Sequence, residues 1–114
     1  MLIDEIYQQL HSTRLAPNHA IFSVRFLGRS ARYYDYLRCT GSQASLTALT
    51  TLAVRLIALA DRFREDGRWS HYSKALDDTA DRVWVEIEAR TYRDAWGASR
   101  VVQAPAALIQ GMEG

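Results

Sequence analysis

The segment from residue 22 to residue 56 constrains the fold of this chain more than any other stretch of the sequence. It holds an apolar run that ends at Gly28, a short stretch rich in arginine and tyrosine, and, after Gly41, a longer apolar run. Glycine accepts the left-handed backbone of tight turns and helix ends, so both glycines are expected to separate helices. The segment therefore predicts the order helix, tight turn, short helix, loop, helix.

Composition extends this prediction to the whole chain. The 114 residues fit one domain with a modest core, and the 48% hydrophobic and 24% charged residues are typical of a globular fold. Proline and glycine are few, and no run alternates apolar and polar residues over the length of a strand. We expect an all-α, five-helix domain over residues 1–96, followed by a C-terminal tail over residues 97–114.

Helical periodicity places the five helices. Apolar residues recur at three- and four-residue steps, which predicts helices over residues 2–13, 19–27, 31–38, 46–65 and 71–96. Ser30 and Ser45 are predicted to cap the third and fourth helices with their hydroxyl groups. Four residues have the spacing to brace the second helix against the third: Val24, Leu27, Tyr34 and Leu37.

The last predicted helix, 71–96, is long for so small a protein. Six residues form its inward stripe: Tyr72, Leu76, Ala80, Val83, Ile87 and Thr91. Three further apolar or aromatic residues lie off this stripe: Trp84, Val85 and Tyr92. They indicate either contact with a partner or packing across the helical core, and the sequence leaves both interpretations open.

Charge is distributed unevenly along the chain. The net charge is only +1, but residues 14–38 contain five arginines and one acid, whereas residues 39–114 contain nine basic and ten acidic residues. A basic segment on a neutral remainder is typical of a local phosphate-contacting face. The alternative is a chance cluster in an arginine-rich protein, since thirteen of the fourteen basic residues are arginine.

Several function classes find no support in the sequence. Cys39 is the single cysteine, which excludes an internal disulfide and a cysteine-based zinc site. The three histidines are far apart, and no glycine-rich phosphate loop is present, so neither a metal, a cofactor nor an enzymatic activity is expected. There is no apolar stretch of about 18 residues and no leader-like N-terminus, which predicts a cytoplasmic protein without a membrane span.

The segment 19–38 has the physical properties of a DNA-reading helix-turn-helix. Such a motif places a short, braced helix after a tight turn, with the start of that helix projecting from the domain. Arg29 and Ser30 lie at the helix start, where they can reach phosphate, and Arg32 and Tyr36 lie about one turn apart, where they can reach base edges. The candidate DNA-binding residues are Arg25, Arg29, Ser30, Arg32, Tyr33, Tyr36 and Arg38.

Two stretches, residues 28–37 (GRSARYYDYL) and residues 45–56 (SLTALTTLAVRL), resemble the Cro/CI-type (lambda-repressor-like) helix-turn-helix family. In that family a Gly-x-Ser turn precedes the recognition helix, and a Pro-Ser-Leu-x-x-Leu-x-x-Leu-Ala element opens the next helix. The resemblance implies a recognition helix near residues 30–38 that contacts double-stranded DNA. It also implies a homodimer, because the family usually reads two half-sites.

Asp35 places a carboxylate on the presumed DNA face. It would repel phosphate unless it accepts a hydrogen bond from cytosine or pairs with Arg32 or Arg38.

Taken together, the motif and the charge distribution predict a sequence-specific DNA-binding protein, a transcriptional regulator of a bacterium or phage. The near-neutral charge and Asp35 favour an alternative, a protein-binding adaptor or inhibitor that uses helix 71–96 and the tyrosines of residues 33–36 against a partner.

Overall fold

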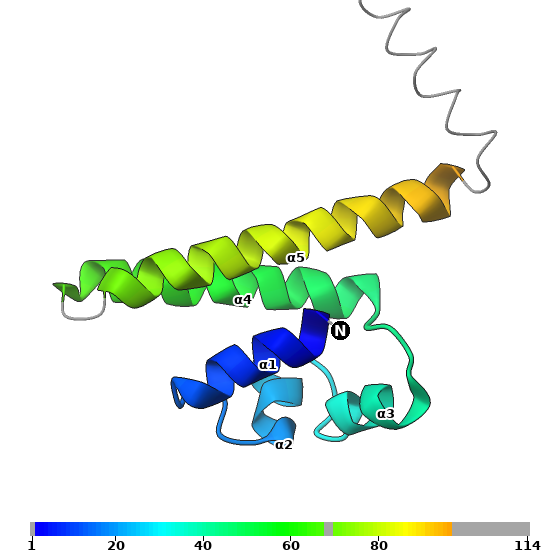
Figure 1. The fold of residues 1–114 in the computed structure, drawn as a ribbon, viewed down its shortest axis with the longest axis horizontal. Coiled ribbons are helices and arrows are strands. Elements are labelled where there is room, and N and C mark those ends of the chain that lie inside the picture. Colours follow the sequence, from blue (N-terminus) through cyan, green and yellow to red (C-terminus); the bar gives the residue numbers. More distant parts are fainter. Residues whose placement is uncertain (1, 68–69, 97–114) are drawn as a thin grey trace, which may run out of the picture.

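The computed structural model describes residues 2–67 and 70–96, with only the backbone for residues 94–96, so the expected tail lies outside the described residues. Its elements are α1 (Leu2–Ser12), α2 (His19–Ile21), the π-helical η1 (Phe22–Phe26), α3 (Tyr33–Thr40), α4 (Leu46–Glu65) and α5 (Ser70–Trp96). Helices are the only regular elements among these residues, which confirms the predicted all-α fold (Figure 1). The predicted second helix, 19–27, is formed by α2 and η1 together.

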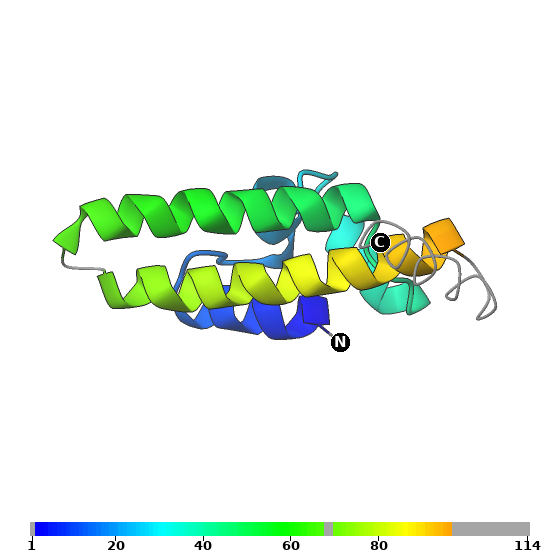
Figure 2. The same ribbon diagram turned by 90° about the horizontal axis from the view of Figure 1, so that it is seen from above.

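The two longest helices form an antiparallel pair. Figures 1 and 2 show α4 and α5 side by side along most of their length. Their facing stripes are built from leucine and valine together with small alanines, which let two helices approach closely. The buried residues of these stripes are Leu49, Leu52, Ala53, Leu56 and Ala60 on α4, and Leu76, Ala80, Val83 and Ile87 on α5. Most of the predicted α5 stripe is therefore confirmed, but Thr91 is exposed.

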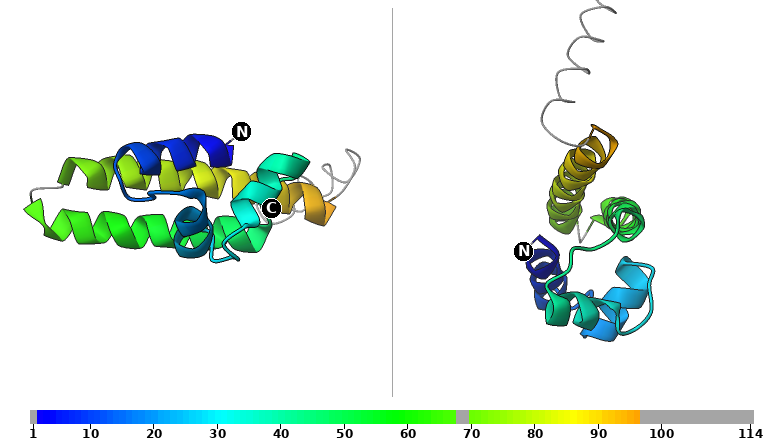
Figure 3. Two further views of the ribbon diagram at one scale, coloured as in Figure 1. Left: turned by 90° about the horizontal axis from the view of Figure 1, so that it is seen from below. Right: turned by 90° about the vertical axis from the view of Figure 1, so that its right-hand side faces the viewer.

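The N-terminal helices lie against one side of this pair. Seen along the long axis in Figure 3, α1 lies on the α5 side and α2 with η1 lies on the α4 side. Two side-chain contacts join α1 to α5: the Thr79 hydroxyl donates to Gln9 Oε1 at 2.7 Å, and Arg82 pairs with Glu5 at 2.8 Å. Helix α3 lies next to α2, and both lie below the α4–α5 pair in the view of Figure 1.

Three helix ends are fixed by residues that lie close to them in the sequence. Asn18 accepts a hydrogen bond from the backbone N–H of Ile21 at 2.8 Å and so begins α2. Ser45 accepts one from Ala48 at 3.1 Å, as predicted for the start of α4. Gly41 ends α3 in the left-handed conformation at φ +69°. The boundaries of α3 itself were predicted two residues too early.

Candidate nucleic-acid interface

The turn that leads into α3 is fixed against α4. Gly28 has φ +64°, and a Cβ atom added there would lie 2.9 Å from Thr51 Cγ2 on α4. The Arg55 guanidinium donates to the backbone carbonyls of Val24, at 3.3 Å, and Arg25 at the end of η1. These contacts place the chain so close to α4 that only glycine fits at position 28 without strain.

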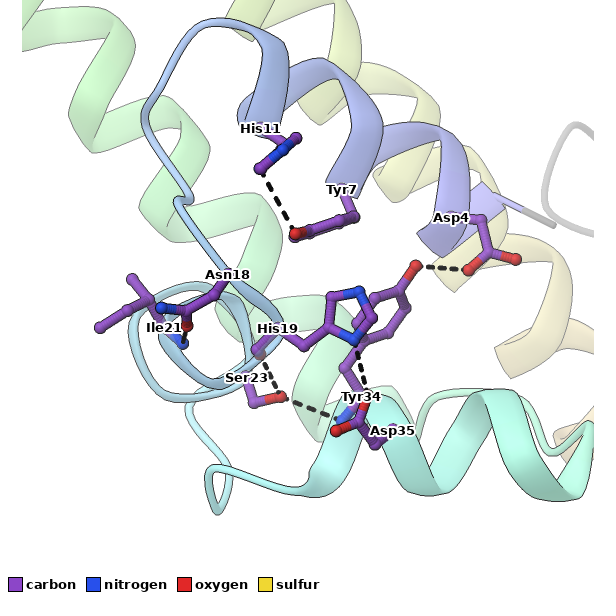
Figure 4. A network of polar contacts seen from close by, with 9 residues as sticks. All are labelled: Asp4, Tyr7, His11, Asn18, His19, Ile21, Ser23, Tyr34 and Asp35. Carbon is purple, nitrogen blue, oxygen red and sulfur yellow. Dashed lines mark hydrogen bonds and ion pairs between the residues drawn. The ribbon is translucent and has the colours of Figure 1, made fainter.

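Helix α3 is capped by a residue from the preceding helix. The Ser30 cap predicted from the sequence is wrong, because α3 begins at Tyr33 with Arg32 as its N-cap residue and no side-chain hydrogen bond from that residue. Instead, the backbone N–H of Tyr34 donates to Ser23 Oγ at 3.0 Å, and Ser23 Oγ donates to the His19 carbonyl at 2.9 Å (Figure 4). Ser23 is completely buried, so one hydroxyl joins the two helices of the motif.

The inner face of α3 is held by Tyr34 and Leu37, both buried. The Tyr34 hydroxyl donates to Asp4 Oδ1 on α1 at 2.5 Å (Figure 4). Its ring packs edge-on against Phe22, with 5.1 Å between ring centroids, and at a tilt of 41° against Tyr7, with 5.2 Å between centroids. Burial raises the pKa of the Tyr34 phenol above its ordinary value, and the hydrogen bond to Asp4 raises it further.

Val24 does not brace the two helices. It was predicted to face α3, but 47% of its surface is exposed. The residues of this segment that turn inward are Phe22, Ser23, Phe26 and Leu27. The apolar run has hydrophobic residues on two sides, so periodicity alone left its orientation open. The buried Ser23 marks the side that faces α3, because its hydroxyl satisfies the start of that helix.

The outer face of α3 and the turn before it are exposed. Arg29, Ser30 and Arg32 are all exposed, and Tyr36 has 56% of its surface accessible. Arg29 lies over the Tyr33 ring, with 5.1 Å from Cζ to the ring centroid. Arg38 lies over the Tyr34 ring at 5.9 Å. These aromatic contacts restrict the two guanidinium groups while leaving them in solvent.

Asp35 has a different partner from those predicted. Its Oδ1 lies 2.6 Å from Nδ1 of His19 at the start of α2, rather than against Arg32 or Arg38 (Figure 4). The side chains remain partly exposed. A carboxylate in the first turn of a helix is also favoured by the helix dipole. Asp35 is thus drawn toward the junction of α2 and α3.

Tyr33 differs from the other candidate residues. Its ring is half-buried, and its hydroxyl accepts a hydrogen bond from the backbone N–H of Ser45 at 2.9 Å. Since Ser45 caps α4, this bond fixes the loop between α3 and α4. Arg25 lies apart as well, at the end of η1 beside Arg55 and Arg62 of α4. Arg29, Ser30, Arg32, Tyr36 and Arg38 are the candidate residues that lie exposed on α3 and on the turn before it.

Three residues that organise the motif were missed from the sequence. His19 and Arg55 have partners 16 to 31 residues away, and no local pattern announces such contacts. Ser23 could have been noticed as the one hydroxyl within an apolar run. Within residues 2–67 and 70–96, no group of histidine, cysteine and carboxylate side chains is placed to hold a metal ion. None of the described helices has the length and apolarity needed to cross a bilayer.

Comparison with known proteins gives a family but no described function. No curated protein and no solved structure matches this chain. A family model, described as "Family of unknown function (DUF6626)", matches residues 3–96. This range covers all the helices from α1 to α5 apart from Leu2, the first residue of α1. The chain therefore belongs to the DUF6626 family.

Proposed function

We propose that residues 19–40 act as a helix-turn-helix and that the protein binds double-stranded DNA in a sequence-specific manner, as a transcriptional regulator. Helix α3 would enter the major groove with its exposed outer face. The proposal accounts for a short helix that is fixed on its inner side by Ser23 and Tyr34, while its outer side and the preceding turn present arginines to solvent.

The observation that carries this proposal is the contrast between the two faces of α3. Recognition of base edges needs a helix whose position is fixed, because hydrogen bonds to bases are geometrically demanding. Tyr34 and Leu37 are 1% exposed, whereas Arg32 and Tyr36 on the opposite face are exposed. The His19 contact draws the Asp35 carboxylate toward α2, which lowers the cost of bringing phosphate to this face.

Each exposed residue then has a role set by its chemistry. Arg32 suits a bidentate contact with guanine, and Tyr36 can pack on a thymine methyl group or donate to phosphate. Arg25, Arg29 and Arg38 would contact the DNA backbone. A homodimer would place two α3 helices about 34 Å apart, one turn of B-form DNA.

The test is selection from a random duplex library, followed by fluorescence-anisotropy titration of the selected duplex at several salt concentrations. The logarithm of the affinity is expected to fall linearly with the logarithm of salt concentration, with a slope of about −0.9 per phosphate contacted. Replacing Arg29 and Arg32 together by alanine should weaken binding by roughly 2–4 kcal/mol, through one phosphate and one base contact. Lys74→Ala is the control, because Lys74 is an exposed cation on α5.

Two results would contradict the proposal. An unchanged affinity of the double variant would show that α3 does not form the interface. Absence of any enriched duplex, together with absence of salt-dependent binding, would exclude DNA as the ligand. Equal weakening by Lys74→Ala would indicate that binding follows overall charge rather than this surface.

One observation favours a second function, a protein-binding adaptor. Val85, on the side of α5 away from α4, has 67% of its surface exposed, and Tyr92 is exposed further along the same helix. Aromatic residues such as Tyr92 are enriched at protein–protein interfaces. In this case the protein would co-purify with a partner in stoichiometric amount, Val85→Asp would abolish that association, and no DNA would be retained.

A further inference from the structure

A groove runs along α4 on the side that α5 does not cover. Two adjoining hollows share Val54 and Arg55 and together extend from Leu46 to Arg62. The residues that decide the character of this α4 groove are Leu46, Thr50, Val54 and Arg62 on α4, and Arg25 and Phe26 on η1. It is distinct from the outer face of α3, which contributes no residue to it.

The length and the apolar floor of the α4 groove match an amphipathic helix. The seventeen residues from Leu46 to Arg62 span roughly 24 Å at a rise of about 1.5 Å per residue, the length of a partner helix of about 16 residues. The floor is mostly apolar or made of threonine methyl groups, and Val54 at its centre has 54% of its surface exposed. An amphipathic helix that lays its apolar face in such a groove would cover this surface.

The charge of the α4 groove indicates which charge its partner would carry. Among the described residues, three ionisable side chains line it, and all three are arginines: Arg25, Arg55 and Arg62. Arg55 already donates to the backbone of η1. The guanidinium groups of Arg25 and Arg62 have no ion-pair partner among the described residues, and no acidic residue lines the groove. Complementary charge across an interface favours a partner with carboxylates beside its apolar stripe.

We propose that the α4 groove binds an acidic amphipathic α-helix of a partner protein, with the apolar stripe of that helix on Val54 and its aspartate or glutamate side chains on Arg62 and Arg25. The apolar floor favours a protein over a nucleic acid, whose backbone is charged throughout. The proposal is independent of DNA binding by α3. Arg25 belongs to both surfaces, so the test rests on Val54 and Arg62.

The probe is a synthetic, fluorescein-labelled helical peptide of about 18 residues with leucines at helical spacing and glutamates on both flanks. A second peptide carries lysine in place of each glutamate, and a third has the acidic composition in an order that breaks the stripe. All three are titrated by anisotropy against the full chain. The acidic peptide is expected to bind about tenfold more tightly than either control peptide at low salt.

Four variants of the full chain locate the binding. Val54→Asp should weaken binding of the acidic peptide about tenfold, and Arg62→Glu about fivefold. Val85→Asp and Lys74→Glu are matched controls. They introduce the same valine-to-aspartate change and the same reversal of a positive charge on the exposed face of α5. Both should bind the acidic peptide within about twofold of the unchanged chain. Circular dichroism of every variant checks that the helices are retained.

Several outcomes would overturn the proposal. These are equal binding of the lysine peptide, loss of binding in Val85→Asp but not in Val54→Asp, and no binding of the acidic peptide at millimolar concentration. Self-association by sedimentation that Val54→Asp removes would make a second copy the occupant. Weaker duplex binding by Val54→Asp, without peptide binding, would assign the groove to nucleic acid.

Discussion

The α1–α3 region and the α4–α5 pair are stabilised in different ways. In the pair, two long helices bury a repeating stripe of leucine, valine and alanine, and the ion pairs on their surface are exposed. In the α1–α3 region the helices are short, and single polar contacts join them in addition to buried apolar side chains: Ser23 to Tyr34, Tyr34 to Asp4, and His19 to Asp35. An apolar side chain contributes through many small contacts with several neighbours. Removing one such hydroxyl instead leaves one polar group without its hydrogen-bond partner.

This difference bears on the candidate interface. A stripe of apolar contacts fixes that two helices pack, but it tolerates small shifts along the stripe. A buried hydrogen bond has a narrow range of distance and angle, so it fixes position more closely. The region that carries the candidate DNA-binding residues is the one whose short helices are positioned by such bonds.

The largest expected effect tests the α4–α5 pair. Leu56 on α4 is fully buried, and Leu56→Ala should lower the free energy of unfolding by about 2–5 kcal/mol through lost burial and the cavity left behind. Ile57→Ala, at the next position but 36% exposed, should cost less than about 1 kcal/mol. Urea unfolding followed by circular dichroism measures both. Equal costs would mean that Leu56 does not lie in the core while Ile57 faces solvent.

A smaller effect is expected at the junction of η1 and α3. Ser23→Ala leaves the buried backbone N–H of Tyr34 without its acceptor and should cost about 1–3 kcal/mol. Ser12→Ala is the matched control, because the exposed Ser12 hydroxyl donates only to a carbonyl of its own helix, and it should cost within about 0.5 kcal/mol.

Hydrogen exchange distinguishes a local from a global effect of Ser23→Ala. The amide of Tyr34 should lose protection first, ahead of amides in α4, because the lost bond belongs to the start of α3. A uniform loss of protection through α4 would contradict the idea that Ser23 acts mainly on α3. A cost as large as that of Leu56→Ala would remove the contrast between the two regions.

Periodicity predicted the α4–α5 pair well. Residues 46–65 were placed at the bounds of α4, and the stripe from Leu76 to Ile87 is buried as expected, because each residue faces a neighbour that repeats at the same spacing. The loop caps at Asn18, Ser45 and Gly41 could also be predicted, because they act within a few residues of themselves. Local chemistry determines these features.

The junction around α3 was predicted less well, and the reason is physical. The third helix was placed two residues early because Ser30 has the chemistry of a cap, yet the acceptor for Tyr34 N–H is Ser23, eleven residues upstream. Val24 was placed inward because the run around it is apolar on both sides. The partner of Asp35 is His19, sixteen residues away. Contacts of this kind depend on the tertiary arrangement, which no pattern in one short segment contains.

The smallest expected effect concerns the bond between α1 and α3. Tyr34→Phe removes the hydroxyl that donates to Asp4 and should cost about 1 kcal/mol at neutral pH, because the partly exposed carboxylate can then be hydrated. Tyr36→Phe is the control, since the Tyr36 ring lies on the exposed face of α3. It should leave the free energy of unfolding nearly unchanged.

The cost of Tyr34→Phe should also depend on pH. Burial and the Asp4 contact raise the pKa of Tyr34 in the folded chain, so above the ordinary tyrosine pKa of about 10 the unfolded chain loses this proton while the folded chain keeps it. Stability contributed by Tyr34 is therefore complete below about pH 10 and is lost as pH rises beyond it. Urea unfolding from about pH 7 to about pH 11 should show the unchanged chain and the phenylalanine variant converging at the alkaline end. A constant difference over this range would mean that the phenol is not buried against Asp4, and that α1 does not hold α3 in the way the structure indicates.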